Sequence, residues 1–325
     1  MATKILGIGS YVPEKVLTNK DLEKIVDTSD EWITTRTGIK ERRICSPSEA
    51  SSDLGYKSAL NAIANAGILK EKIEMIITAT ITPDMPFPST SCIMQKKLGL
   101  DNIPCFDINV ACSGFIYGLE IARNFIDSGT YSTILIIATD CMSSVTDYTD
   151  RSTCILLGDG SASAVVAKSD EGPGILGSYL GASGKYAELL YMPAGGSRQP
   201  ASIGTVSQRL HYMKMEGSTV YKIAINSMVD AVNMVLKKTG ISKDDISLFI
   251  PHQANLRIIQ SVGKNLGIPM EKTFINIERY GNMSAASVGV ALDEAARAGK
   301  VRKGDIICMV AFGSGFVWAS NIIKI

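Results

Sequence analysis

The sequence has no excess of charge of one sign and no long hydrophobic run. Its 325 residues include 33 Lys and Arg against 32 Asp and Glu, giving a net charge of +1. This balance argues against a nucleic-acid or membrane partner. The longest apolar runs, such as Ile134–Ala138 and Ile306–Phe312, fall well short of the roughly 20 residues that span a bilayer. The N-terminus lacks the apolar stretch of a signal peptide, so we expect a cytoplasmic protein.

Histidine is scarce, and the cysteines are not paired. The only histidines are His211 and His252, and the seven cysteines are scattered without a Cys-x-x-Cys motif. This pattern argues against a disulfide framework and against a structural zinc site, and we expect no metal. A typical cysteine here is expected to be a small buried side chain. His211 has no strand-end context and is expected to be an ordinary surface residue, so His252 is the better partner for a catalytic thiol.

What the sequence has is apolar material, at 46% of residues, and an internal repeat. Each half has a helix ending at Gly, an apolar strand, a helix ending at Leu-Gly, a strand end, a helix beginning with small residues, and a buried strand. In the first half the first helix is at 59–67 and the strand at 75–77, and the second helix ends at 98–100. The strand end is at 106–109, the third helix ends at 128–129, and the buried strand is at 133–139. In the second half the first helix is at 225–240 and the strand at 248–250, and the second helix ends at 266–268. The strand end is at 274–276, the third helix ends at 298–299, and the buried strand is at 305–311.

The repeat predicts the fold class. Alternating helices and strands imply crossover connections and a parallel or mixed sheet covered on both faces. We therefore expect an α/β protein of two pseudo-symmetric halves, residues 1–170 and 171–325, packed as alternating helix and sheet layers.

Three side chains with catalytic potential occupy matching places in the repeat. Cys112 falls opposite Asn282, each at the head of a small-residue helix, and His252 follows the strand at 248–250. Ligands usually bind at such strand ends in α/β sheets. A helix N-terminus favours a thiolate, which predicts a lowered pKa for Cys112. The Asn282 amide and the backbone of Gly313–Gly315 could stabilise an oxyanion. The alternatives are that Cys112 only packs and that His252 is structural.

Two glycine motifs are weaker. Gly7-Ile-Gly9 lacks the third glycine of a dinucleotide-binding fingerprint. The sequence Leu157-Gly-Asp159-Gly160-Ser is interpreted as a tight Asp-Gly turn between strands.

Three motifs together carry a family resemblance. Val110-Ala-Cys112-Ser-Gly-Phe, Pro251-His252-Gln-Ala-Asn255 and Gly281-Asn282-Met-Ser-Ala-Ala-Ser287 closely resemble the β-ketoacyl-acyl-carrier-protein synthases of type III. These enzymes start bacterial fatty acid synthesis and have the thiolase fold. Further motifs in family order are Thr28-Ser-Asp-Glu-Trp32-Ile, Arg36-Thr-Gly-Ile, Phe87-Pro-Ser-Thr, Asp150-Arg151-Ser-Thr, Leu157-Gly-Asp-Gly160 and Ala311-Phe-Gly-Ser-Gly-Phe316.

The resemblance implies a Cys-His-Asn triad. Cys112 would take an acetyl group from acetyl-CoA as a thioester, and malonyl-acyl-carrier protein would lose carbon dioxide and attack it. His252 and Asn282 would hydrogen-bond the malonyl thioester oxygen. The amides of Cys112, Ser314 and Gly315 would form the oxyanion hole. No cofactor is expected beyond the coenzyme A thioester substrate.

The resemblance also implies binding residues. Trp32 and Arg151 would sandwich the adenine of coenzyme A, with Arg36 on its phosphates. The remaining coenzyme A contacts would be Met215, Tyr221, Ala224, Ala254 and Asn255. Phe87 would close the acyl pocket of a homodimer partner. Acyl-carrier protein would dock on Gln253, Ala254, Asn255, Leu256, Arg257 and Lys264. Taken without the family, Arg36, Lys40, Arg42 and Arg43 would be a solvated basic face.

Departures from the family pattern at Met283 and Ser314 leave the primer open, since pocket lining sets chain length and branching. A ketosynthase of a specialised pathway and a catalytically silent acyl-CoA- or carrier-protein-binding module remain as alternatives. A degradative thiolase needs a second Cys near the Gly313–Gly315 loop, and this loop has none. An elongating synthase needs a His where this sequence has Asn282. Both kinds of enzyme are therefore disfavoured.

Overall fold

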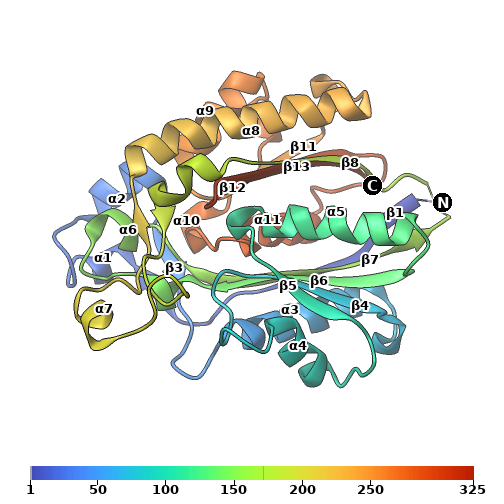
Figure 1. Ribbon diagram of the computed structural model, residues 1–325. Coiled ribbons are helices and arrows are strands. Elements are labelled where there is room, and N and C mark those ends of the chain that lie inside the picture. The colour runs from blue at the N-terminus through green and yellow to red at the C-terminus, as the bar shows by residue number, and fades with distance from the viewer. Residues whose placement is uncertain (1, 171) are drawn as a thin grey trace.

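Helices and sheets alternate in five layers in the computed structural model, which describes residues 2–170 and 172–325 (Figure 1). Helices α3 (Ser51–Ala66) and α4 (Thr90–Leu98) form one outer layer, and α8 (Gly217–Thr239) and α9 (Leu256–Leu266) form the other. Between the two sheets lie α5 (Gly114–Asp127) and α11 (Ala286–Arg297). The predicted α/β class with alternating layers is confirmed.

The first sheet has the strand order β1-β7-β6-β4-β5. Its strands are β1 (Ala2–Tyr11), β4 (Met75–Ala79), β5 (Cys105–Ile108), β6 (Thr133–Cys141) and β7 (Asp159–Ser169). β4 runs parallel to β5 and β6, whereas β7 is antiparallel to both of its neighbours. The mixed sheet carries the ends of β5 and β6 to the same edge.

The second sheet has the order β11-β12-β13-β8. Its strands are β8 (Ile175–Ala182), β11 (Leu248–Pro251), β12 (Ile306–Gly313) and β13 (Val317–Lys324). β11 is parallel to β12, and the other pairs are antiparallel. The predicted boundary between the two halves falls between residues 170 and 171, and residue 171 lies outside the described residues.

Two predicted elements are wrong. The segment 274–276 is not a strand, because Thr273 makes only one bridge to Phe249 and the Asn276 N–H then donates to the Gln253 side chain instead of a strand. Asp159 and Gly160 are not a turn but the start of β7. The Asp159 carboxylate accepts hydrogen bonds from the backbone of Cys45 and Ser143, which holds this segment extended.

The central helices are almost wholly buried because apolar residues cover both of their faces. Phe115, Ile116 and Leu119 of α5 and Val288 and Ala291 of α11 are inaccessible to solvent. Burying each large apolar side chain stabilises the fold by about 1.5–3 kcal/mol. This core fixes the N-terminal ends of α5 and α11, where Cys112 and Asn282 lie.

The Gly7 and Gly9 pair serves helix packing. A Cβ at either position would stand 2.3 Å from a backbone nitrogen of α3, Ala66 or Ala62. Only glycine lets α3 lie this close on β1. Close packing therefore accounts for this motif without a nucleotide.

Short elements gather at the end of the molecule opposite the chain termini (Figure 1). The short elements of the chain are β2 (Val16–Thr18), α1 (Asn19–Leu22), α2 (Asp30–Thr37), β3 (Glu41–Arg43), α6 (Arg151–Cys154), β9 (Leu190–Tyr191), α7 (Ile203–Ser207), β10 (Lys214–Met215) and α10 (Ile277–Tyr280). Figure 1 labels α1, α2, β3, α6 and α7 at this end. Short 3₁₀ helices occur at Lys70–Lys72, Ala111–Ser113, Met142–Val145, Gly184–Leu189, Lys243–Asp245 and Met270–Lys272. In the described part of the chain, no helix combines the length and apolarity needed to span a bilayer.

Candidate active site

Cys112 lies in a tight turn between β5 and α5. Ala111 has a left-handed backbone (φ 45°), and Cys112 follows it within the 3₁₀ turn that leads into α5. Gly313, the last residue of β12, lies against this turn, since a Cβ there would stand 2.6 Å from the Cys112 nitrogen. The turn and the glycine together present the thiol, and its backbone N–H, at the junction of two cavities.

The prediction of a lowered pKa for Cys112 is wrong. Burial, with a smaller contribution from the negative charge of Asp140, raises the pKa of the Cys112 thiol to about 12. A hydrogen bond with Ser284 opposes the shift without reversing it. Desolvation is the largest cause, and it outweighs the hydrogen bonds with Ser284 and with the Cys112 backbone N–H, which favours the neutral thiol.

His252 follows β11 and is held by the neighbouring strand. Its backbone N–H donates to the Val310 carbonyl at 2.8 Å, and its side chain is 2% exposed. Neither ring nitrogen hydrogen-bonds to another described residue. Burial lowers the pKa of His252 to about 4, so the imidazole is neutral at physiological pH. A neutral imidazole has one N–H to donate to a ligand.

Asn282 is fixed through its backbone and its amide oxygen. Its N–H donates to the Leu156 carbonyl at 2.8 Å, and its carbonyl accepts from the Gly158 N–H at 3.0 Å. The side-chain Oδ1 accepts from the Ser284 N–H at 2.8 Å. Because that bond uses the oxygen, the amide NH₂ is the end that can donate to a ligand.

The structure brings Cys112, His252 and Asn282 together. All three line one cavity of about 240 Å³, which also includes residues of α2, α8 and β12. Two neutral donors thus face the same space as a nucleophile, an arrangement that can stabilise negative charge developing on a carbonyl oxygen.

A second cavity of about 360 Å³ adjoins Cys112 and Asn282 on the other side. Ser314 and Gly315, predicted for the oxyanion hole, line it together with Cys112. The rest of its wall is mainly apolar, with four methionines that sequence reasoning did not single out for this pocket: Met142, Met192, Met213 and Met215. Only Met215 was predicted, as a coenzyme A contact. Methionine scattered over separate loops carries no sequence signal for a shared pocket.

The residues predicted to hold adenine lie side by side on the surface. The guanidinium carbons of Arg36 and Arg151 stand 4.3 Å and 4.8 Å from the Trp32 ring centre. Arg36 reaches Trp32 because they are one turn apart on α2. An adenine between Trp32 and Arg151 would need about 7 Å, two stacking distances. The predicted sandwich therefore requires the Arg151 side chain to move outward.

The other predicted coenzyme A contacts connect this surface to the thiol. Met215, Tyr221, Ala224, Ala254 and Asn255 all line the cavity that contains Cys112, and Arg36 lies at the same cavity. The Asn255 side chain donates to the Arg36 carbonyl at 3.1 Å, which joins α9 to α2.

One predicted docking residue is wrong. The Gln253 side chain is fully buried, donating to the Pro251 carbonyl at 2.7 Å and accepting from the Asn276 N–H, so it cannot contact a carrier protein. The Gln253 side chain instead links the segment 274–276 to the end of β11. Arg257 and Lys264 are exposed on α9, whereas Ala254, Asn255 and Leu256 are half-buried.

Arg42 is not part of a solvated basic face. Its side chain is fully buried and donates to the carbonyls of Leu17 and Ile155 and to Asn19 Oδ1 at 2.7–3.2 Å. Burial lowers its pKa to about 10. These bonds tie β2 and β3 to the loop behind Cys154, so its role is structural.

Two site residues were missed by sequence reasoning. Asp140, at the end of β6, is fully buried, and Ser284 has a left-handed backbone (φ 49°) with its hydroxyl 3.7 Å from Cys112 Sγ. The available signal for Asp140 was a carboxylate two residues after the apolar run Ile134–Ala138. Ser284 gave no signal, because its position depends on how 281–285 folds against 156–158.

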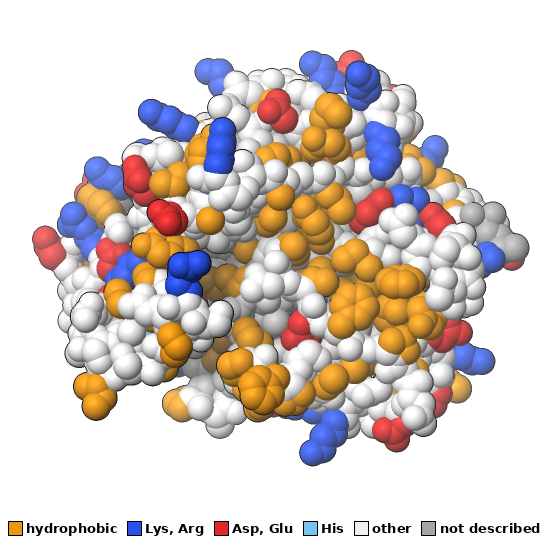
Figure 2. All heavy atoms as spheres, in the orientation of Figure 1, with side chains coloured by type: hydrophobic (Ala, Val, Ile, Leu, Met, Phe, Trp, Pro, Cys, Tyr) orange, Lys and Arg blue, Asp and Glu red, His pale blue; other side chains and the backbone are white. Residues whose placement is uncertain are grey.

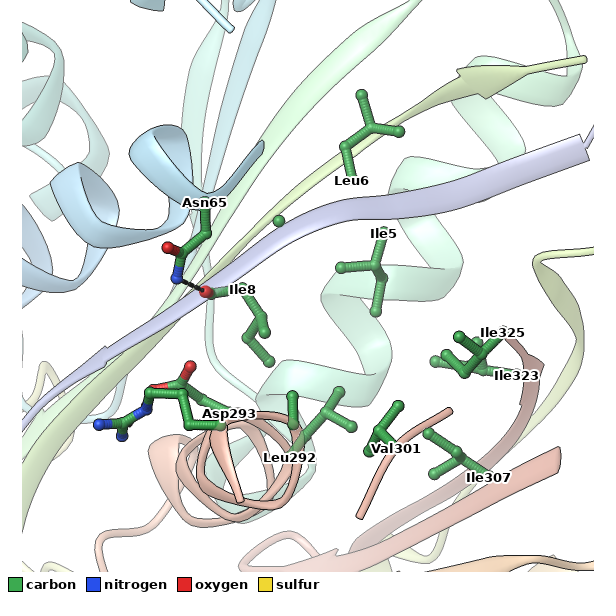
Figure 3. Close-up of a pocket in the computed structure, with 13 residues that line it drawn as sticks. Ile5, Leu6, Ile8, Asn65, Leu292, Asp293, Val301, Ile307, Ile323 and Ile325 are labelled. Carbon is green, nitrogen blue, oxygen red and sulfur yellow. Dashed lines mark hydrogen bonds and ion pairs between the residues drawn. The ribbon is translucent and has the colours of Figure 1, made fainter. Parts of the chain in front are cut away.

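A further cavity lies away from this site. Figure 3 shows Ile5 and Ile8 of β1 facing Leu292 of α11, with Ile307 and Ile323 from the second sheet. The cavity holds about 410 Å³ and has none of the predicted catalytic or binding residues in its wall. In residues 2–170 and 172–325, no cluster of three or more His, Cys, Asp or Glu side chains could hold a metal ion.

Comparison with known proteins identifies the family. The family model of 3-oxoacyl-[acyl-carrier-protein] synthase III matches residues 106–184. The model of the C-terminal part of the same family matches residues 236–325. The β-ketoacyl-[acyl-carrier-protein] synthase III of Caldanaerobacter subterraneus is 55% identical over 324 residues, covering 100% of this chain and 98% of its own. The chain belongs to the synthase III family.

Two further relatives agree with this assignment. The synthase III of Clostridioides difficile is 50% identical, covering 98% of this chain and 97% of its own. The crystal structure of 3-oxoacyl-[acyl-carrier-protein] synthase III from Aquifex aeolicus is 45% identical, with a TM-score of 0.92 over 100% of both chains. The resemblance, its thiolase-like fold and the expected acyltransferase activity of fatty acid synthesis are confirmed.

Proposed function

We propose that this synthase III condenses acetyl-CoA with malonyl-acyl-carrier protein, through an acyl-Cys112 intermediate, to give acetoacetyl-acyl-carrier protein, coenzyme A and carbon dioxide. The observation that carries the proposal is the single cavity shared by Cys112, His252 and Asn282. That cavity runs from the thiol to Arg36 beside Trp32, which suits a ligand with a long arm and an anionic, aromatic head.

In the first half-reaction, Cys112 attacks the thioester carbonyl of acetyl-CoA, the bond from the acyl carbon to the coenzyme A sulfur breaks, and coenzyme A leaves as a thiol with the proton that Cys112 gives up. The backbone N–H groups of Cys112 and of the Ser314–Gly315 turn stabilise the tetrahedral intermediate, and Gly313 allows their close approach. The arm of coenzyme A lies along Met215, Tyr221 and Ala224. The acetyl group occupies the apolar cavity beyond Cys112.

In the second half-reaction, the malonyl thioester oxygen accepts hydrogen bonds from His252 and from the Asn282 amide NH₂. Both donors are neutral and preorganised, so they stabilise the enolate charge that develops as carbon dioxide leaves. The carbanion then attacks the carbonyl of acyl-Cys112, and the bond from the acyl carbon to Cys112 Sγ breaks. Cys112 leaves as a thiolate and takes up a proton to regenerate the free thiol. Neither step draws on a metal or redox group, and we propose that only coenzyme A thioesters and the carrier protein take part.

Acyl-carrier protein would dock on the exposed face of α9. Arg257 and Lys264 lie seven residues apart, on the same side of this helix, and both are solvent-exposed. Their positive charges complement an acidic partner next to Ala254 and Asn255 at the cavity.

We propose that the working form is a homodimer. Among the described residues, β5 is an edge strand that pairs only with β4, and its residues are half-buried in the single chain. Figure 2 shows apolar side chains gathered across the middle of the face where α5 and β5 lie. Phe87 is 83% exposed and lines neither cavity of its own chain, which supports a role in the partner's acyl pocket.

We propose a cytoplasmic location. All seven cysteines are free thiols, including pairs such as Cys45 and Cys141 whose sulfurs are 3.1 Å apart. Neighbouring free thiols suit a reducing compartment.

Intact-protein mass spectrometry tests the proposed function. The protein is mixed with acetyl-CoA and with longer, branched and aromatic acyl-CoA thioesters, and malonyl-acyl-carrier protein is then added. We expect preferential acetyl uptake, no uptake by Cys112→Ser, and a β-ketoacyl group on the carrier. His252→Ala should still acylate but lose decarboxylation by at least about 10²-fold.

The alternatives give different outcomes. Acylation only by a longer or branched group would assign the protein to a specialised pathway. No acylation by any thioester would leave a silent binding module and overturn the proposal.

A further inference from the structure

Part of the wall of the apolar cavity beside the nucleophile belongs to a single loop. This cavity of about 360 Å³ is lined by Met142 and Val145, from the 3₁₀ helix after β6, and by Met192 and Met213. The last two are the ends of residues 192–213, here called the cover segment, which joins the paired strands β9 and β10 and carries α7. The position of the cover segment therefore determines the size of the cavity.

The cover segment has little apolar packing of its own. Within its 192–213 range only Ala194 and Thr205 are buried, and Ile203 is 92% exposed. Figure 1 shows the loop with α7 at the end of the molecule opposite the chain termini. Because burial of apolar side chains is the main source of stability in a fold, polar contacts are needed to hold this segment in place.

An arginine of the cover segment makes such contacts. Arg209 Nε and Nη2 donate to the two carboxylate oxygens of Asp147 at 2.6–3.1 Å. The Asp147 side chain is 5% exposed, and the guanidinium carbon of Arg209 lies 4.7 Å from the centre of the Tyr212 ring. Arg209 keeps the pKa of Asp147 well below its usual range, so the carboxylate is ionised at neutral pH. An arginine that donates to both oxygens of a carboxylate fixes geometry as well as charge.

This Arg209–Asp147 clamp adjoins the cavity wall on both sides. Asp147 follows Val145 by two residues, and the Val145 carbonyl accepts from the Met213 N–H at 2.9 Å. Lys214, next to Met213, places its Nζ 3.6 Å from Asp147 Oδ2. The cover segment and the 3₁₀ helix after β6 are thus joined by one buried carboxylate and one backbone bond, both next to residues that line the cavity.

We propose that Arg209 is a specificity-determining residue: by holding the cover segment against the 3₁₀ helix after β6, it limits the length of the acyl group that Cys112 accepts. The inference rests on the proposed function. Arg209 contacts no substrate and is a positioning residue that acts through Met192 and Met213. Without the clamp these two methionines move outward, because little else holds the segment, and the cavity admits a longer chain.

Competition among acyl-CoA thioesters tests this role. The protein is mixed with equimolar acetyl-, butyryl-, hexanoyl- and octanoyl-CoA, and intact-protein mass spectrometry at early times counts each acyl-Cys112 form. Relative to the wild type, Arg209→Ala should raise the ratio of hexanoyl to acetyl uptake by about tenfold, the lower end of what one methylene contact contributes to selectivity. The rate of acetyl uptake should stay close to that of the wild type.

A conservative variant separates the clamp from a general structural role. Arg209→Lys keeps the positive charge but not the planar fork, so its ratio should lie between those of the wild type and Arg209→Ala. Arg198→Ala is the matched control, because Arg198 is exposed in the same segment and takes no part in the bonds to Asp147; it should match the wild type. A variant that merely destabilised the fold would lower the uptake of all thioesters together.

Hydrogen–deuterium exchange measures the hold on the cover segment without using activity. The Met213 N–H is protected by its bond to the Val145 carbonyl. Local opening exposes such an amide to solvent, so peptides containing Met213 should exchange several-fold faster in Arg209→Ala than in the wild type. Arg198→Ala should exchange like the wild type.

Three results would overturn the inference: an unchanged ratio of hexanoyl to acetyl uptake in folded Arg209→Ala, unchanged exchange at Met213 in that variant, or the same changes in Arg198→Ala. If Arg209→Ala does not fold, Arg209→Gln, which removes the charge but keeps much of the side chain, decides by the same two measurements. No acylation of the wild type by any thioester would instead overturn the proposed function.

Discussion

Burial keeps both Cys112 and His252 uncharged, although it moves their pKa values in opposite directions. It raises the pKa of the thiol to about 12 and lowers that of the imidazole to about 4. A neutral imidazole can donate a hydrogen bond to the malonyl thioester oxygen without adding a charge to an apolar cavity. At the scale of the residue, desolvation therefore decides the protonation state of the site.

The shifted pKa of His252 predicts a pH-dependent stability. Below its ordinary value of 6.5 the unfolded chain protonates this histidine, while the folded protein does not until about pH 4. Protons therefore favour the unfolded state in that window, and stability falls as the pH falls. Between pH 7 and pH 4 we expect the wild type to lose about 3 kcal/mol more unfolding free energy than His252→Asn, from 1.36 kcal/mol per pKa unit.

Urea unfolding at a series of pH values measures this difference, with His211→Asn as the control for a half-buried histidine. Equal losses for the wild type and His252→Asn would contradict the prediction.

At the scale of the element, the end of β12 determines the shape of the oxyanion hole. Gly313 ends this strand, and β13 begins at Val317. The turn between them lines the cavity beside Cys112, and Ser314 is anchored by a hydrogen bond to the Leu190 carbonyl. A strand from the second sheet thus completes a site whose nucleophile follows a strand of the first.

Gly313→Ala tests this arrangement. The added Cβ would lie 2.6 Å from the Cys112 nitrogen and 2.9 Å from the Ala111 Cβ, so the turn must shift. We expect kcat to fall by about 10²-fold, the size of losing one oxyanion-hole donor, with little change in the KM for acetyl-CoA. Steady-state kinetics measure both constants. Gly196→Ala, where a Cβ meets nothing within 4 Å, should behave as the wild type.

The exposed positive charges of α9 predict an effect on the KM for malonyl-acyl-carrier protein that is separate from the KM for acetyl-CoA. Reversing the charge of the exposed Arg257 with Arg257→Glu should raise the KM for malonyl-acyl-carrier protein by about fivefold and leave the KM for acetyl-CoA unchanged. The difference should shrink as salt screens the interaction. Lys237→Glu, on the exposed end of α8, is the control. Equal effects of both reversals would indicate a general charge effect, not a docking site.

At the scale of the whole molecule, the single chain leaves a sheet edge and a large aromatic side chain uncovered. In residues 2–170 and 172–325, no strand pairs with the outer side of β5, and Phe87 lies on the loop between β4 and α4 at 83% exposure. Unpaired edges favour pairing with another chain. A second copy would cover both features at once.

Mixed dimers test whether Phe87 acts on the partner. Phe87→Ala homodimers should lose acetyl selectivity, because one wall of the pocket is missing. In a heterodimer of Phe87→Ala with Cys112→Ser, the intact Cys112 faces the intact Phe87 of the other subunit. We expect that site to regain wild-type selectivity, measured as acyl uptake from mixed acyl-CoA thioesters. Selectivity like that of the Phe87→Ala homodimer would place the role of Phe87 within its own subunit.

Much of the fold was predictable because it follows from periodicity. The repeated order of apolar strands and Gly-terminated helices predicted the layers, and α3 and α8 end at Gly67 and Gly240 as expected. Both glycines have left-handed backbones. The prediction of a strand end at 274–276 was wrong because only the Phe274 N–H bonds to a strand, at the Phe249 carbonyl. The Phe274 carbonyl and the Asn276 N–H bond instead to the Gln253 side chain, a contact that local patterns do not contain.

The sequence by itself determined the family and the identities of Cys112, His252 and Asn282, because their motifs combine reactive side chains with glycine and small residues that local geometry requires. Tertiary structure decided their environment. Burial reversed the expected pKa shift of Cys112, hid Gln253 and Arg42, and placed Asp140 and Ser284 behind the thiol. Desolvation and contact depend on residues that are distant in the sequence, such as Cys112 and Ser284, which are 172 positions apart, and only the folded chain brings these together.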